Sequence, residues 1–443
     1  MRDEFRILRR ALPVAAAWLG LAATTAPAHA QSLLELYDLA RAYDATYLSA
    51  RALAESVPYR VEQSRALLRP SASLNTNAAR VQTQPTFGNN YGSDSRNLSL
   101  NGRQPLFSPV NSVTVRQSER SLDASIADLA TAEQDLMLRV SQAYFDVLGA
   151  EDTLRTTQAN KAAIAEQLAS AKRNFEVGTA TITDTREAQA RFDLATAQEI
   201  AANNDLVVRR IALDQLVGRI DVVPRQLQVP VVLPPVAIQG VDTLVGRAAE
   251  AHPAVQRAQV AFDIAQLETE KARAQRLPTI DAVASLSAGR GAVSSTVSGD
   301  NRGASLGVQI NLPLYTGGSI QNRIKETLVL EERSRQDLEA ARRLVAQATR
   351  QAFYTLQSGA AQVRALEAAE ASSRLALEAT QLGYRVGVRV NVDVLNAQSQ
   401  LFQTRRDLAR ARYDVLLGTL RLQQAAGQLT PADIEAINRL LVP

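Results

Sequence analysis

Cysteine is absent from this chain of 443 residues, and histidine occurs only at positions 29 and 252. The chain therefore has no thiol nucleophile, no Cys/His zinc site and no multi-histidine metal site. His252 could serve a Ser-His-Asp triad, but it precedes Pro253 at an apparent helix start, where a capping or packing role explains it better. Most acidic residues fall among arginines and lysines on expected helix faces, which argues against a hydrolase with two catalytic carboxylates. We expect neither catalysis nor a bound metal or cofactor.

The first thirty residues are typical of a secretory signal peptide. Their basic start is supplied by Arg2, Arg6, Arg9 and Arg10. An apolar stretch from Ala11 to Ala23 follows, and Ala28-His29-Ala30 matches a cleavage site. The stretch is shorter than the ~20 residues that a membrane-spanning helix needs. We expect residues 1–30 to be removed and the mature chain to begin at Gln31, which is not the cysteine that a lipid anchor would require there.

An excess of either charge is also missing. Lysine and arginine number 49 and the acidic residues 45. The expected signal peptide holds four of the basic and two of the acidic residues, so the formal net charge falls from +4 to +2 without it. The two signs are interspersed, which argues against nucleic acid as a partner. After residue 30 no apolar run reaches the length of a membrane-spanning helix.

The chain contains an internal duplication. The segment from Phe175 to Asp184 aligns with the segment from Tyr384 to Asp393 at an offset of 209 residues. Further pairs at offsets of 208 or 209 are Asp44 with His252, Pro70 with Pro278, Ala143-Tyr144 with Ala352-Phe353, and Gly218 with Gly427. Matches over so long a span at nearly one offset indicate a repeat. We expect a first repeat over residues 31–218, a Pro-rich linker over 219–240, a second repeat over 241–428 and a tail over 429–443.

Each repeat shows the same succession of periodicities. Helices are expected over 32–68, 113–176, 180–217, 241–276, 319–383 and 390–426, with Pro58 the one interruption in the first of them, and strands over 70–107 and 278–314. Leu306, Val308 and Ile310 alternate with polar residues, as in a strand between lipid and a watery pore. A soluble β-sandwich strand has the same pattern. Export of the chain and its count of four long strands favour a membrane barrel closed by three copies, with twelve strands.

The long helices predict the rest of the architecture. Residues 113–176 would span ~96 Å as a helix, and their apolar residues step in heptads with many alanines, which indicates close coiled-coil packing. The shorter helices 32–68 and 180–217 could stack end to end beside this helix. The fold class we expect is α+β: a trimeric, twelve-stranded β-barrel with four strands per protomer, continued by a long α-helical coiled-coil barrel and built from an internally duplicated protomer.

At this level the chain resembles the TolC family of trimeric outer-membrane channels. The resemblance rests on the duplicated element order, on Pro105-Leu106-Phe107 and Pro313-Leu314-Tyr315, and on the two motifs that begin at Phe175 and Tyr384. It implies a passive exit duct in the cell outer membrane that crosses the periplasm as part of a tripartite efflux pump or type I secretion system. The implied partners are a second and third copy of the chain, a periplasmic adaptor protein, an inner-membrane pump and outer-membrane lipid.

The resemblance also implies a gate at the periplasmic tip. Thr183, Asp184, Tyr384 and Arg389 match the positions that link neighbouring coiled coils in the closed family members, where Arg389 could pair with Asp184 and Tyr384 add a hydrogen bond. Gly178 and Gly387 are expected at the hairpin turns.

An acidic ring is implied at the tunnel entrance. Asp393 matches one of the two acidic positions of the family ring. Asn396 replaces the second acid, and Glu187 occupies the corresponding place in the first repeat. Ordinary capping and turn chemistry would also explain such tip residues.

One alternative stays open at this point: a periplasmic coiled-coil structural or adaptor protein, in which the strands form a small soluble domain. The loop tips 84–96 and 290–303, rich in glycine, asparagine and serine, are expected to face outside the cell. The sequence does not name the cargo or the pump.

Overall fold

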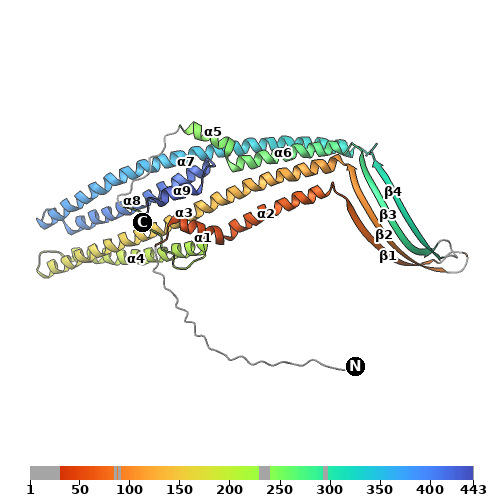
Figure 1. The fold of residues 1–443 in the computed structure, drawn as a ribbon. Coiled ribbons are helices and arrows are strands. Elements are labelled where there is room, and N and C mark those ends of the chain that lie inside the picture. The colour runs from red at the N-terminus through yellow and green to blue at the C-terminus, as the bar shows by residue number, and fades with distance from the viewer. Residues whose placement is uncertain (1–29, 84–86, 88–90, 229–239, 293–297, 443) are drawn as a thin grey trace, which may run out of the picture.

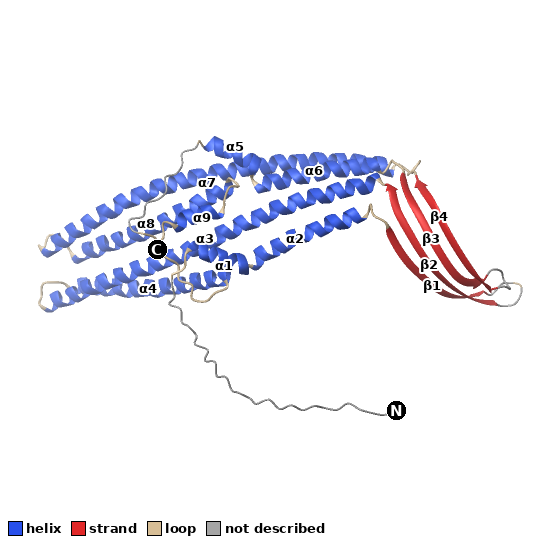
Figure 2. Ribbon diagram, viewed as in Figure 1, coloured by secondary structure: helices blue, strands red, loops and turns tan. Residues whose placement is uncertain are grey.

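The computed structural model describes residues 30–442 apart from 84–86, 88–90, 229–239 and 293–297. Almost all of the expected signal peptide and most prolines of the expected linker (Pro230, Pro234 and Pro235) lie outside the described residues. The described part is elongated, with long helices at one end and a curved sheet at the other (Figures 1 and 2). None of its helices is apolar enough over a sufficient length to cross a membrane.

The element order confirms the α+β fold class and the internal duplication. In chain order the elements are α1 (Leu33–Tyr43), α2 (Ala45–Ala66), β1 (Ser71–Thr83), β2 (Tyr91–Phe107), α3 (Pro109–Glu176), α4 (Ile182–Val217), α5 (Val241–Ala251), α6 (Pro253–Ala274), β3 (Thr279–Ala292), β4 (Ser298–Asn311), α7 (Ser319–Arg385), α8 (Asn391–Ala425) and α9 (Pro431–Asn438). The strands reach into both expected loop tips, since β2 already begins at Tyr91 and β4 at Ser298.

The segments expected as helices over 32–68 and 241–276 are each broken, at Asp44 and at His252. The break at His252 agrees with the helix start and capping role expected for this residue, whereas the break at Asp44 was not expected. Asp44 ends α1 and caps α2, because its carboxylate accepts a hydrogen bond of 2.7 Å from the Tyr47 amide. His252 caps α6 in the same way through a bond of 3.1 Å from the Ala254 amide, and Pro253 has no amide hydrogen with which to continue α5. Pro58, the interruption expected from the sequence, instead lies inside α2.

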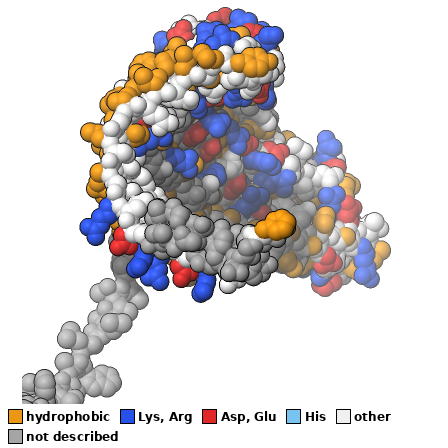
Figure 3. Space-filling view, turned by 90° about the vertical axis from the view of Figure 1, so that its right-hand side faces the viewer, with side chains coloured by type: hydrophobic (Ala, Val, Ile, Leu, Met, Phe, Trp, Pro, Cys, Tyr) orange, Lys and Arg blue, Asp and Glu red, His pale blue; other side chains and the backbone are white. Residues whose placement is uncertain are grey.

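Four antiparallel strands form one sheet in the order β1-β2-β3-β4. The register places Leu74, Leu100, Leu286 and Ala304 in one row, with Leu306, Val308 and Ile310 on the same face. The last three are 86%, 63% and 65% exposed in the protomer. Figure 3 shows hydrophobic side chains along the convex side of the curved sheet and mostly uncharged polar surface along its inner side. The alternation read from β4 therefore extends over the whole sheet.

The inner face carries one ion pair near the end where the sheet joins the helices. Arg103 donates a hydrogen bond of 2.7 Å to Oδ2 of Asp281. The Asp281 side chain is 8% exposed and that of Arg103 62%. The carboxylate is thus buried beneath a guanidinium that faces the open side of the sheet.

The helices form two hairpins, α3–α4 and α7–α8, which end together at the far tip (Figure 1). Both α2 and α4 pack along α3, one beside each half of it, which agrees with the expected end-to-end stacking. Among the apolar heptad positions of α3, Val140 and Val147 are fully buried, whereas Ile126 and Phe175 are 59% and 43% exposed in the single protomer.

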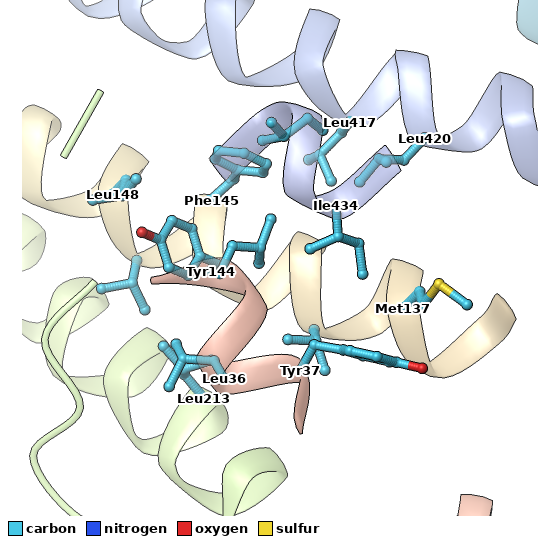
Figure 4. Packing of buried hydrophobic residues seen from close by; sticks show 14 of the residues in the cluster. Leu36, Tyr37, Met137, Tyr144, Phe145, Leu148, Leu213, Leu417, Leu420 and Ile434 are labelled. Atoms are coloured by element: carbon cyan, nitrogen blue, oxygen red, sulfur yellow. The ribbon is translucent and has the colours of Figure 1, made fainter. Parts of the chain in front are cut away.

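The largest hydrophobic core lies midway along the helices, where α1, α3, α4, α8 and α9 meet (Figure 4). It includes Tyr144, whose hydroxyl donates to the carbonyl oxygen of Arg225 at 2.8 Å. Short β-bridges join Gln31 to Pro224 and Leu227 to Leu441. The described part of the linker therefore ties the segments around Gln31 and Leu441 to this core. The helix α9, within the expected tail, was not foreseen.

Candidate gate at the tip of the helix hairpins

Both hairpin turns contain a glycine in the left-handed region. Gly178 has φ +78° and Gly387 has φ +79°, and a side chain at either position would meet no atom within 4 Å. The requirement for glycine is therefore one of backbone conformation and not of space. In each turn a backbone amide closes onto the preceding helix: Thr179 N donates to Asn174 O at 2.8 Å and Val388 N to Gly383 O at 2.9 Å.

Asp184 takes part in a capping box at the start of α4. Its amide donates to Thr181 Oγ1 at 3.2 Å, and its carboxylate accepts from the Thr181 amide at 3.0 Å and from the Thr181 hydroxyl at 2.7 Å. These bonds fix the Asp184 carboxylate at the positive end of the helix dipole. Thr183 lies beside it on the first turn of α4 and is exposed.

The second hairpin uses its acidic residue differently. The cap of α8 is Val390, which has no side-chain acceptor, so Asp393 is not engaged in a capping box. The carboxylate of Asp393 instead lies 3.6 Å from the guanidinium of Arg389. The Arg389 side chain is 63% exposed, and within the protomer its ion pair is with Asp393 and not with Asp184.

Polar contacts connect the hairpins near the tip, and two of them join α3 to the second hairpin. Asn174 Nδ2 of α3 donates to the Tyr384 hydroxyl of α7 at 3.4 Å. Further from the tip, the Gln167 amide donates to the Asn391 side chain at the start of α8. Tyr384 thus provides one contact between the two hairpins of one protomer.

Arg191 of α4 occupies the expected acidic entrance. It donates a hydrogen bond of 2.8 Å to Asn396 Oδ1 of α8 and lies 3.5 Å from the Glu187 carboxylate. Each expected ring acid therefore has an arginine beside it, Arg389 for Asp393 and Arg191 for Glu187. In this conformation the negative charge at the tip is largely compensated.

The contributors to the tip that were missed in the sequence include Asn174, Arg191 and Gly383. The spacing of Glu187 and Arg191 by four residues on a helix was a readable signal for an ion pair. The contact of Asn174 with Tyr384 joins segments 210 residues apart, which local patterning does not reveal. Gly383 contacts Val388 and Arg389 across the turn that follows it, and its role depends on how that turn folds back onto α7. Among the residues that the structure describes, no group of three or more acidic or imidazole side chains could hold a metal ion.

A duplicated chain with a curved sheet, apolar on its convex side, and two long helix hairpins defines the class of outer-membrane channels with a helical periplasmic extension. The family model "Outer membrane efflux protein" matches residues 36–219 and 244–428, one match for each repeat. The chain belongs to this family. An outer-membrane location follows, and it decides against the periplasmic adaptor.

Named relatives and solved structures agree with this assignment. The outer membrane protein TolC of Vibrio cholerae is 31% identical over 414 residues, covering 92% of this chain and 93% of its own. The alkaline protease secretion protein AprF of Pseudomonas aeruginosa is 31% identical over 423 residues, covering 93% and 87%. The crystal structure of the Campylobacter jejuni CmeC outer membrane channel superposes with a TM-score of 0.77 at 16% identity, over 99% of this chain and 98% of that one. At 16% identity the superposition supports only the similarity of fold.

Proposed function

We propose that three copies of this chain form an exit duct through the outer membrane for an efflux pump or a type I secretion system. The observation that carries the proposal is the sheet: its convex face exposes a row of leucine, valine and isoleucine side chains, and its inner face is polar. Exposing such an apolar surface to water is unfavourable in free energy, whereas contact with lipid is favourable.

The strand count supports a trimer. The described sheet has β1 and β4 at its edges, and four strands are too few to close a barrel. Pairing β4 of one copy with β1 of the next would close twelve strands, an even number within the known range. The same threefold arrangement would cover heptad residues left bare in the protomer, such as Ile126.

The helical end would close the duct. Arg389 and Tyr384 lie at the end of α7 and its turn, and Thr183 and Asp184 lie on the first turn of α4. In the closed trimer, Arg389 would turn from Asp393 toward Asp184 of a neighbouring copy, with Tyr384 and Thr183 beside the contact. One exposed pair contributes only ~0–1 kcal/mol, but threefold symmetry repeats it. A gate of this strength could be opened by a docking partner.

The entrance would be lined by Asp393 and Glu187, each with its arginine neighbour. Partners of two kinds would complete the system, a periplasmic adaptor and an inner-membrane pump. The relatives bear names from both settings, since TolC is named as an outer membrane protein and AprF as an alkaline protease secretion protein. The proposal includes no nucleic acid partner.

The gate is tested by the conductance of the purified protein in a planar bilayer. Arg389→Ala should raise the single-channel conductance several-fold, because it removes the cation that links neighbouring copies. Arg385→Ala, at an exposed arginine one turn earlier with no ion pair among the described residues, is the matched control and should leave conductance unchanged. Equal conductance of Arg389→Ala and the unaltered protein would contradict the gate.

A further inference from the structure

We propose that Gly383, in the last turn of α7, is a positioning residue for Arg389. A Cβ atom at position 383 would lie 2.8 Å from Arg389 Cγ and 3.5 Å from Arg389 Cβ. The first distance is shorter than carbon atoms tolerate. The stem of the arginine therefore occupies the space that a side chain at 383 would fill.

The backbone fixes the same two residues against each other. The Gly383 carbonyl oxygen accepts hydrogen bonds from the Val388 amide at 2.9 Å and from the Arg389 amide at 3.2 Å. Cα of Arg389 is thus held beside the end of α7, and its stem lies over Gly383. From this position the guanidinium reaches to 3.6 Å from Asp393.

The first repeat shows that the turn itself does not require glycine at this position. Asn174 is the equivalent of Gly383, and Ala180 is the equivalent of Arg389. The Asn174 carbonyl accepts from the Thr179 amide at 2.8 Å and from the Ala180 amide at 3.1 Å, which is the same pattern. Gly383 is also not among the glycines with positive φ.

The two repeats place their larger side chain on opposite sides of the turn. In the first, a large residue in the helix is followed by a small one after the turn. In the second, glycine in the helix is followed by arginine after the turn. Glycine lowers helix stability relative to alanine, so its presence in the helix needs a compensating reason. Space for the Arg389 stem is that reason.

The inference rests on the proposed gate and predicts how a single methyl group affects it. Gly383→Ala favours the helix but forces the Arg389 stem away, which displaces the guanidinium. The variant should therefore conduct more than the unaltered protein, with at least half of the increase that Arg389→Ala produces. Its apparent melting temperature should not fall.

A double-mutant cycle in planar bilayers tests this directly. Conductance is measured for the unaltered protein, Gly383→Ala, Arg389→Ala and the double variant. Gly246→Ala is the matched control, because Gly246 also lies in a helix and has no atom within 4 Å of its built Cβ. If Gly383 acts through Arg389, Gly383→Ala adds nothing to Arg389→Ala, and Gly246→Ala leaves conductance unchanged.

The outcomes separate the inference from the gate itself. Unchanged conductance in Gly383→Ala, together with a leaking Arg389→Ala, would overturn the inference and leave the gate intact. A further increase in the double variant would also overturn it, because Gly383 would then act independently of Arg389. If Arg389→Ala conducts like the unaltered protein, the gate fails and the positioning role fails with it.

Discussion

Arg191 on α4 donates a hydrogen bond of 2.8 Å to Oδ1 of Asn396 on α8. The contact crosses from one helix hairpin to the other at a position where the family resemblance implies an acidic residue. The same arginine lies 3.5 Å from Glu187. An amide at position 396 accepts this bond without adding negative charge, so the tip carries less negative charge than an entrance with two acidic rings.

The first prediction concerns block of the pore by cations. Asn396→Asp should strengthen the block by a trivalent cation such as La³⁺, because the proposed trimer would gain three carboxylates at its proposed entrance. Arg191→Gln combined with Asn396→Asp should strengthen it further, since the compensating cation is then lost. The blocking concentration, measured in bilayers, checks both. Asn396→Ser, which adds no charge, serves as control, and equal block of Asn396→Asp and Asn396→Ser would contradict the prediction.

The second prediction concerns the break between α1 and α2. Asp44 caps α2 and accepts two hydrogen bonds from Arg139, at 2.9 and 3.0 Å. Asp44→Ala removes the cap and should cost about 0.5–2 kcal/mol of unfolding free energy for this contact alone. Asp44→Asn keeps an acceptor for the Tyr47 amide and should lose less. Thermal melting of both variants in detergent checks the order, which the opposite ranking would refute.

Lowering the pH should weaken the contact between Asp44 and Arg139. Hydrogen bonds from Arg139 hold the pKa of Asp44 below its ordinary value. The folded state therefore favours the carboxylate, and this stabilisation is present above the ordinary pKa and is lost as the pH falls through the lower folded value. The difference in melting temperature between the unaltered protein and Asp44→Asn should shrink as the pH approaches that value. A difference that stays constant on acidification would argue against a charged Asp44.

The third prediction concerns His252, the only histidine after residue 30. Burial lowers its pKa from 6.5, and a hydrogen bond to the backbone of Gln424 opposes this shift. The folded state thus favours neutral imidazole, whose nitrogen accepts from the Ala254 amide. The stabilisation that neutral His252 contributes is fully present above pH ~6.5, and it decreases as the pH falls below that value toward the folded pKa.

His252→Asn keeps a capping acceptor that does not titrate. Between pH 7.5 and 5.5 the unaltered protein should therefore lose more melting temperature than the variant, and equal losses would contradict the assignment.

The fourth prediction concerns the ion pair on the inner face of the sheet. Arg103→Gln leaves the buried carboxylate of Asp281 without its cation, which should lower the melting temperature clearly. Adding Asp281→Asn should recover most of the loss, because no unpaired charge then remains buried. Melting curves of the two variants check this. Failure of the second substitution to recover stability would show that Arg103 contributes through something other than the pair.

Patterns confined to one segment could be read from the sequence. The alternation around Val308 predicted a strand with one apolar face, and the repeat at a nearly constant offset predicted the order of elements in both halves. Glycine at 178 and 387 marked the two turns. Each of these signals depends on backbone conformation or periodicity, which a local stretch determines.

Features that depend on contacts between segments could not be read in this way. The break at Asp44 was hidden within helical composition, although the repeat offset aligned this residue with His252, for which a helix start was expected. The pairing of Arg389 with Asp184 between neighbouring coiled coils stays a prediction. Within the protomer Asp184 is engaged with Thr181 and Arg389 with Asp393. Both of these partners lie three or four residues away, so, unlike contacts between distant segments, they were local signals in the sequence.

The most direct test of the proposed duct is the mass of the processed protein after extraction from the cell envelope. Membranes are separated into inner and outer fractions, and the protein is solubilised and sized in detergent by light scattering with the detergent mass subtracted. The account predicts a complex of three chains that is found in the outer-membrane fraction and is released only by detergent. A monomer or dimer released into the periplasm without detergent would contradict it.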